Sequence, residues 1–180
     1  NRESSGSEDF LVAQFKGFKK DLENLLSYEI KGEDIETAFV LYEDYRATMR
    51  EFVELVNDYP QTLDPKTRHM IIKAAYFQDK KTYTEKLKTL MEALKKEPKE
   101  EKRGPRVIIT GLMTEPEKFL DLFTEYGYTF AADDLAHESR QFRVPARTSG
   151  TAIEKMAGRI IDLKGCTFFY EENKSRGTIL

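Results

Sequence analysis

The sequence contains a single cysteine, Cys166, in a chain of 180 residues. One cysteine cannot form a disulfide within the chain, and this usage is typical of cytosolic proteins, so we expect a cytoplasmic location. The chain also has only two histidines, His69 and His137. These few soft ligands are not enough for a self-contained zinc or iron–sulfur site.

Long hydrophobic runs are also missing. No stretch approaches the roughly 20 apolar residues that a membrane-spanning helix needs, and the first ten residues, NRESSGSEDF, lack the apolar centre of a secretory signal. Nor does charge of one sign dominate, because 29 basic and 32 acidic residues give a net charge of −3. This balance gives no reason to expect a nucleic acid or an anionic membrane as a partner.

What the sequence does contain is helical periodicity over its first half. Hydrophobic residues make up 39% of the chain and recur at spacings of three and four from Phe10 to about Lys96. Gly32 interrupts this pattern, and Asp64 followed by Pro65 predicts the start of a further helix. We therefore expect about four helices with buried apolar faces. Their apolar positions include Phe10, Phe15, Phe18, Leu22, Leu25, Ile35, Phe39, Met49, Phe52, Val56, Met70, Ile71, Tyr83, Leu87, Met91 and Leu94.

The charged, proline- and glycine-containing stretch KKEPKEEKRGP separates this region from one with a different period. It predicts a helical connector region over 1–97, a linker over 98–105 and an α/β domain over 106–180. We expect the last domain to be truncated at its C-terminus, because SRGTIL ends the sequence on an apolar run.

The α/β domain is predicted from alternating strand and helix patterns. The segments RVIITG, YTFAA and CTFFY are typical of buried strands, and helices are expected in MTEPEKFLDLFTEYG and TAIEKMAGRIIDLK. In the first helix, Thr114 is the expected cap, Pro116 belongs to the first turn and Gly127 ends it. The order strand–helix–strand–helix–strand predicts a partial Rossmann-like, parallel, three-layer α/β domain.

The stretch AADDLAHESRQFRVP follows the second predicted strand, at the sheet edge where ligands bind in such folds. Asp133 and Asp134 could bind a ribose, a metal or a substrate hydroxyl, or one of them could cap the following turn. Both interpretations remain open from the sequence. His137 is more typical of a surface histidine than of a catalytic base.

The same stretch carries an acid, a hydroxyl and two guanidinium groups. Arg140 and Arg143 could hold a carboxylate or phosphate through paired hydrogen bonds, and Glu138 could orient one of them or transfer a proton. The alternative is a solvated turn, where such ion pairs contribute roughly 0–1 kcal/mol. Spacing alone favours the solvated turn.

Three further candidate residues lie near the two ends of the predicted third strand. Lys174 and Arg176 could meet an anionic ligand at the same sheet edge, or face solvent. Cys166 begins the strand, where a lone cysteine is usually inert packing.

Several blocks of the chain resemble the 2-hydroxyacyl-CoA dehydratase family, whose relatives include benzoyl-CoA reductase subunits. The resemblance runs from about Phe10 to Leu180, and its most specific block is DDLAHESRQFR, similar to the larger-subunit form of the dehydratases. The second block is GCTFFYEENKSRGTIL. The helical part is similar in character more than in individual residues.

The resemblance implies an activity for the intact protein. Family members are lyases that remove water from (R)-2-hydroxyacyl-CoA thioesters in anaerobic amino-acid fermentation, through a ketyl radical. An ATP-hydrolysing iron–sulfur activator supplies the electron. Two homologous subunits form the enzyme, each typically with a [4Fe–4S] cluster held by cysteines.

The resemblance also implies that this chain is a segment, because family subunits are about twice as long. The cluster-binding cysteines are expected outside it, with Cys166 a doubtful ligand, and the segment alone is expected to be inactive. Glu138 and Ser139 are then the candidate catalytic residues. Candidates for binding the substrate or the partner subunit are Asp133, Asp134, Arg140, Arg143, Lys174 and Arg176. A benzoyl-CoA reductase-type subunit and a non-catalytic assembly module remain as alternatives.

Overall fold

The computed structural model describes residue 4 and residues 6–163. The described part of the chain divides into two compact units. The first contains residues up to Val40 together with those from Val144 onward, and the second runs from Leu41 to Arg143. The elements are α1 (Ser7–Leu26), α2 (Gly32–Leu55), η1 (Val56–Asp58), α3 (Pro65–Ala74), α4 (Lys80–Leu94), β1 (Arg106–Gly111), α5 (Lys118–Glu125), β2 (Thr129–Leu135), η2 (Ser139–Gln141) and α6 (Ala152–Asp162).

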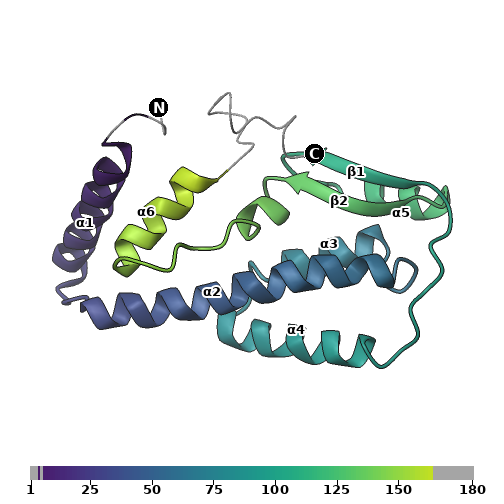
Figure 1. The fold of residues 1–180 in the computed structure, drawn as a ribbon, viewed down its shortest axis with the longest axis horizontal. Helices are drawn as coiled ribbons and strands as arrows, with labels where there is room; N and C mark the ends of the chain where they lie inside the picture. The colour runs from purple at the N-terminus through teal and green to yellow at the C-terminus, as the bar shows by residue number, and fades with distance from the viewer. Residues whose placement is uncertain (1–3, 5, 164–180) are drawn as a thin grey trace. The chain divides into compact units, whose positions relative to one another are not determined.

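In the first unit, α1 packs against α6 (Figure 1). Arg147 joins the two helices, because its guanidinium donates to Glu8 of α1 at 2.7 Å and to Asp162 of α6 at 2.8 Å. The predicted burial of the α1 apolar stripe is wrong for the described residues: α1 has no buried residue, and Phe18 is 62% exposed. A physical reason is that α6 has 11 residues against 20 in α1, so it covers only part of it.

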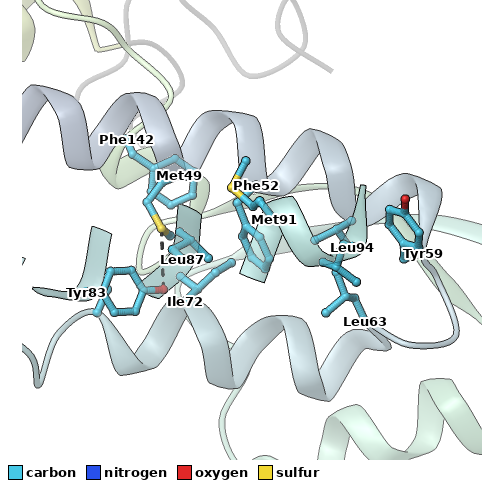
Figure 2. Close-up of a cluster of buried hydrophobic side chains, with 12 residues drawn as sticks. Met49, Phe52, Tyr59, Leu63, Ile72, Tyr83, Leu87, Met91, Leu94 and Phe142 are labelled. Atoms are coloured by element: carbon cyan, nitrogen blue, oxygen red, sulfur yellow. Dashed lines mark hydrogen bonds between the residues drawn. The ribbon is translucent and has the colours of Figure 1, made fainter. Parts of the chain in front are cut away.

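The second unit holds the main hydrophobic core, between the C-terminal half of α2, α3 and α4 (Figure 2). Tyr83, Leu87 and Met91 lie one helical turn apart on α4 and are all buried, as their spacing predicted. The Tyr83 hydroxyl avoids an unsatisfied buried donor by donating to the backbone oxygen of Ile71 at 2.6 Å. The cluster comprises Met49, Phe52, Val56, Tyr59, Leu63, Ile72, Ala75, Tyr83, Leu87, Met91, Leu94 and Phe142.

The start of α3 is set locally by the sequence. Asp64 is its N-cap and accepts a hydrogen bond from the backbone N–H of Thr67 at 2.8 Å, while Pro65 occupies the first turn. The cap satisfies one of the amide groups that a helix start leaves unpaired, and proline needs no partner there. This prediction is confirmed, and it fixes where the next turn of α3 places Arg68 and His69.

β1 and β2 form a parallel pair with α5 as the crossover (Figure 1). Leu120 is buried, and the rings of Phe123 and Phe130 meet edge-on at 5.1 Å, so α5 packs against β2. The strand 106–111 is confirmed, but its predicted burial is wrong for the described residues, because none of its six residues is buried and Ile108 is 50% exposed. The helix, crossover and parallel pair agree with the α/β class. The three-layer Rossmann-like arrangement stays a prediction, and the strand predicted over 166–170 lies outside the described residues.

The end of β2 and the start of α5 differ from their predicted positions. β2 continues through Asp133 and Asp134 to Leu135, because both aspartates keep their ladder partners on β1. Thr114 does not cap a helix, because α5 begins later and its N-cap is Glu117. Gly127 ends α5 with φ of 71°, as predicted, since this conformation suits a residue without a Cβ. The division into 1–97, 98–105 and 106–180 stays a prediction.

Among the described residues, the structure contains no helix with the length and hydropathy that a membrane crossing requires.

Candidate functional site

The end of β2 is tied to the turn that follows it by Asp133. Its Oδ1 accepts hydrogen bonds from the backbone N–H groups of Leu135 and Ser139, both at 3.1 Å. The Ser139 hydroxyl returns a bond of 2.9 Å to the backbone oxygen of Asp133. The interpretation that one aspartate caps this turn is therefore confirmed for Asp133.

Asp134 binds the two arginines of the same stretch. Arg140 grips its carboxylate with two hydrogen bonds, from Nε to Oδ1 at 2.8 Å and from Nη2 to Oδ2 at 2.7 Å. Arg143 adds a bond from Nη1 to Oδ1 at 2.6 Å. Burial by itself raises the pKa of Asp134, but the two guanidinium groups outweigh it and hold that pKa below its ordinary value. The Arg140 guanidinium is thus paired with a buried carboxylate of the same chain. The Arg140 side chain is 6% exposed, against 19% for Arg143.

A residue of α3 connects to this stretch from a distant part of the sequence. The Arg68 guanidinium donates through Nη2 to Asp133 and through Nη1 to Glu138, and all three side chains are almost fully buried. Arginine suits this position because its planar fork can serve two carboxylates at once. Arg68 therefore locks the turn after β2 onto α3.

His69, the next residue of α3, shares Glu138 with Arg68. Its Nδ1 lies 2.8 Å from Glu138 Oε1, and the Thr114 hydroxyl lies 2.9 Å from Nδ1 and 3.2 Å from the same carboxylate oxygen. A carboxylate only accepts, so Nδ1 carries the proton. The hydrogen bond to Glu138 raises the pKa of His69 despite burial, which acts in the opposite direction. In turn, His69 and Arg68 overcome the effect of burial and lower the pKa of Glu138.

The second ring nitrogen of His69 has no hydrogen-bond partner among the described residues, although it is buried. The closest carboxylate oxygen, Glu115 Oε1, lies 3.4 Å away. That separation is an electrostatic contact, not a well-formed hydrogen bond. Leaving a buried polar nitrogen unsatisfied typically costs about 1–3 kcal/mol.

His69 also lines a cavity of about 270 Å³ within the second unit. Tyr76, Phe77 and Met113 provide most of its apolar wall, and His137 also lines it. The remaining lining residues are His69, Lys73, Glu115 and Glu138. Lys73 donates to Glu115 at 2.5 Å and to Glu117 at 3.1 Å, and these two bonds raise the pKa of the lysine. The cavity therefore combines an apolar wall with ionisable side chains of both signs.

The structure brings together the predicted residues Asp133, Asp134, Glu138, Ser139, Arg140 and Arg143. His137 is exposed, as expected of a surface histidine. Lys174, Arg176 and Cys166 lie outside the described residues. Five side chains form one hydrogen-bonded group, which we name the Arg68 cluster: Arg68, His69, Thr114, Asp133 and Glu138.

Sequence patterns missed Arg68, His69 and Thr114. A signal existed for Arg68, because it precedes the buried Ile72 by one helical turn and so shares the apolar face of α3. A charged residue on such a face needs a buried partner. The pattern could not say which carboxylate provides it.

A [4Fe–4S] cluster needs four thiolate ligands in its common form. The chain has one cysteine, and the described residues contain no group of three or more His, Cys, Asp or Glu placed to hold a metal. The residues of this chain therefore do not by themselves fit such a cluster.

Comparison with known proteins gives a family. The family model for the D-component of 2-hydroxyglutaryl-CoA dehydratase matches residues 2–180. The chain belongs to the 2-hydroxyacyl-CoA dehydratase family. This confirms the resemblance drawn from the motif blocks.

Three relatives in this family are β subunits of dehydratases. The chain is 35% identical to the lactoyl-CoA dehydratase β subunit of Anaerotignum propionicum, over 100% of the chain and 48% of that protein. It is 33% identical to the (R)-phenyllactyl-CoA dehydratase β subunit of Clostridium sporogenes, over 98% of the chain and 47% of that protein. It is 29% identical to the (R)-2-hydroxyglutaryl-CoA dehydratase β subunit of Acidaminococcus fermentans, over 98% of the chain and 47% of that protein. The chain thus spans about half the length of the relatives it matches.

Proposed function

We propose that the chain is part of a β-type subunit of an (R)-2-hydroxyacyl-CoA dehydratase, a lyase that removes water from a 2-hydroxyacyl-CoA. The family match over residues 2–180 carries this proposal, because it includes the whole stretch from Asp133 to Arg143. The named relatives are subunits, so we further propose a homologous partner subunit and no activity for this segment alone.

The elimination is chemically difficult because the β-hydrogen of such a thioester is not acidic. We propose that one electron added to the thioester carbonyl gives a ketyl radical, which expels the 2-hydroxyl as hydroxide. Loss of the β-proton and return of the electron then leave the unsaturated thioester and water. An ATP-hydrolysing iron–sulfur activator would supply the electron. A [4Fe–4S] cluster of the intact enzyme, if it resembles other family members, would be bound by cysteines outside this chain, in a cytoplasmic, anaerobic setting.

The contacts of the second unit support a positioning role for most of the predicted site residues. Asp134 and Arg140 bind each other, and Asp133 and Glu138 bind Arg68, so these four side chains hold the turn after β2 in place. We propose that Arg143, the more exposed arginine, faces the anionic part of the acyl-CoA or the partner subunit. Glu138 and Ser139 stay candidate catalytic residues.

The test is an anaerobic assay of the full-length protein with its partner subunit and activator. The substrates are lactoyl-CoA, phenyllactyl-CoA and 2-hydroxyglutaryl-CoA, with benzoyl-CoA as the reductase control. We expect an unsaturated thioester from at least one 2-hydroxyacyl-CoA, only when ATP and activator are present. Reduction of benzoyl-CoA without dehydration would replace the proposal with a reductase. A complex that assembles but converts none of the four thioesters would indicate an assembly module.

A further inference from the structure

The segment between β1 and α5, residues 112–117, is tied to α3 by charged side chains. Lys73 of α3 donates to Glu115 at 2.5 Å and to Glu117 at 3.1 Å, so one ammonium group holds two carboxylates of the segment. All three side chains are about one-third exposed, and ion pairs at such positions add little stability each. We name residues 112–117 the strap.

The strap has little apolar packing of its own. Leu112 and Met113 are 55% and 51% exposed, and Thr114 is the one buried residue among the six described residues of the strap. By contrast, the helix that follows is anchored by Leu120, which is fully buried. Segments with few buried apolar contacts open locally at a lower free energy than the core does. We therefore expect the strap to open separately from α5.

The strap covers Glu138, a candidate catalytic residue whose side chain is 2% exposed. The buried Thr114 hydroxyl lies 3.2 Å from Glu138 Oε1, so the strap contacts the carboxylate directly. Met113 and Glu115 of the strap line the cavity of about 270 Å³, and Glu138 lines it as well. Opening the strap would therefore widen this cavity and uncover the carboxylate.

The other elements around the cavity are fixed to each other. Arg68 of α3 donates to Asp133 and Glu138, so α3 and the turn after β2 hold each other in place. Both of these ion pairs are almost fully buried. The ion pairs of the strap lie at the surface instead, where water can replace them. Of the elements that line the cavity, the strap is therefore the one that can open without unfolding of the others.

We propose that the strap opens and closes over Glu138, and that Lys73 is the latch that keeps it closed. In the closed state, which is the one in this structure, Thr114 covers the carboxylate. In the open state Glu138 is accessible from the cavity, while Arg68 still holds the turn after β2. A role for Glu138 in dehydration rests on the proposed function, whereas the strap and its latch do not.

Carboxyl footprinting of the full-length protein measures the opening directly. A carbodiimide couples glycine ethyl ester to accessible carboxyl groups, and peptide mass spectrometry gives the labelling rate at Glu138. Lys73→Met removes the latch. Lys66→Met is the matched control, because Lys66 pairs with Asp121 at 2.8 Å and so also links α3 to α5, but outside the strap. We expect the labelling rate of Glu138 to rise about threefold or more in Lys73→Met, as the loss of two exposed ion pairs implies, and to stay unchanged in Lys66→Met.

Asp134 is the internal reference, because it is 1% exposed and pairs with Arg140 and Arg143 instead of the strap. Its labelling should stay low in both variants. A rise at Asp134 together with Glu138 would indicate unfolding and overturn the inference, as would equal labelling of Glu138 in the two variants.

Salt gives a second measurement on the unaltered protein, which decides the matter if Lys73→Met does not fold. A salt concentration of about 1 M, where the Debye length is roughly 3 Å, should weaken the latch and raise the labelling of Glu138 but not of Asp134. Labelling of Glu138 that does not change with salt would then overturn the inference. None of these results depends on turnover, so a strap that opens in a protein without dehydratase activity refutes the proposed function alone.

Discussion

Arg68 and Glu138 form a buried ion pair across 70 positions of the sequence. The arginine comes from the first turns of α3 and the glutamate from the turn after β2, so the pair joins the helical part of the second unit to its sheet. Both side chains are at least 96% buried. A pair with this burial stabilises the fold only while both partners are present.

Replacing Arg68 by methionine should therefore destabilise the protein strongly. The substitution keeps the apolar stem but leaves Asp133 and Glu138 as buried carboxylates without their cation. Breaking a buried pair in this way typically costs about 3–5 kcal/mol of unfolding free energy. Urea denaturation measures the loss. Lys66→Met is the control, because Lys66 lies on the same helix as Arg68 and forms a half-exposed pair with Asp121 of α5. Similar losses in the two variants would contradict a structural role for Arg68.

The stability of the protein should decrease as the pH rises above the ordinary pKa of histidine. The pKa of His69 is raised in the folded state, chiefly by its hydrogen bond to Glu138. A raised pKa gives stability that is fully present below the unfolded value of 6.5 and is lost as the pH rises through the folded value.

Urea unfolding of the protein and of His69→Gln between about pH 5 and about pH 8, where histidine changes charge, measures this effect. The variant should lack the alkaline part of the loss. On the acid side, the lowered pKa values of Glu138 and Asp134 predict stability that is kept above their ordinary values and lost as the pH falls through the folded ones. If His69→Gln loses the same stability as the pH rises, that loss comes from titrating groups other than His69.

Arg140 and Arg143 should respond differently to substitution, although they bind the same carboxylate. Arg140→Lys cannot reproduce the two parallel bonds to Asp134, so a buried acceptor loses a partner at a cost of about 1–3 kcal/mol. Arg143→Ala should cost less stability, because its side chain is more exposed and Arg140 still neutralises Asp134.

If Arg143 faces substrate or the partner subunit, its alanine variant should still lower turnover or subunit association in the full-length complex. Analytical ultracentrifugation and the dehydration assay separate the two effects. Turnover and association that are unchanged in both Arg140→Ala and Arg143→Ala would remove these residues from the site.

The sequence predicted those features that depend on neighbouring residues. Asp64 with Pro65 begins α3, and Gly127 ends α5, because each acts on backbone groups within a few positions. The Arg68 cluster could not be predicted, since its hydrogen bonds join segments 24 to 70 residues apart. The end of β2 was placed too early for a related reason: aspartate is unfavourable in strands, but Arg68 and Arg140 neutralise Asp133 and Asp134 there.

The helix cap at Asp64 offers a smaller and local test. Asp64→Ala removes the acceptor for the Thr67 N–H, which lies 2.8 Å from Oδ1, and should cost about 0.5–2 kcal/mol of unfolding free energy. Asp64→Asn retains a cap oxygen and should stay close to the unaltered protein. Equal losses for alanine and asparagine would point to the carboxylate charge, or to its contact with Thr124, as the stabilising feature.

Gly104 and Gly127 form a matched pair for separating backbone strain from steric clash. Both have φ of 71°, a conformation that costs an alanine roughly 1–2 kcal/mol. A Cβ at Gly127 would meet nothing within 4 Å, whereas a Cβ at Gly104 would lie 2.1 Å from the backbone oxygen of Gly127. Gly127→Ala should therefore show the strain alone, and Gly104→Ala should lose more because the approach of residue 104 to the end of α5 must open. Thermal unfolding of the two variants gives the difference. A Gly104→Ala protein as stable as Gly127→Ala would mean that the segment before β1 does not pack against Gly127.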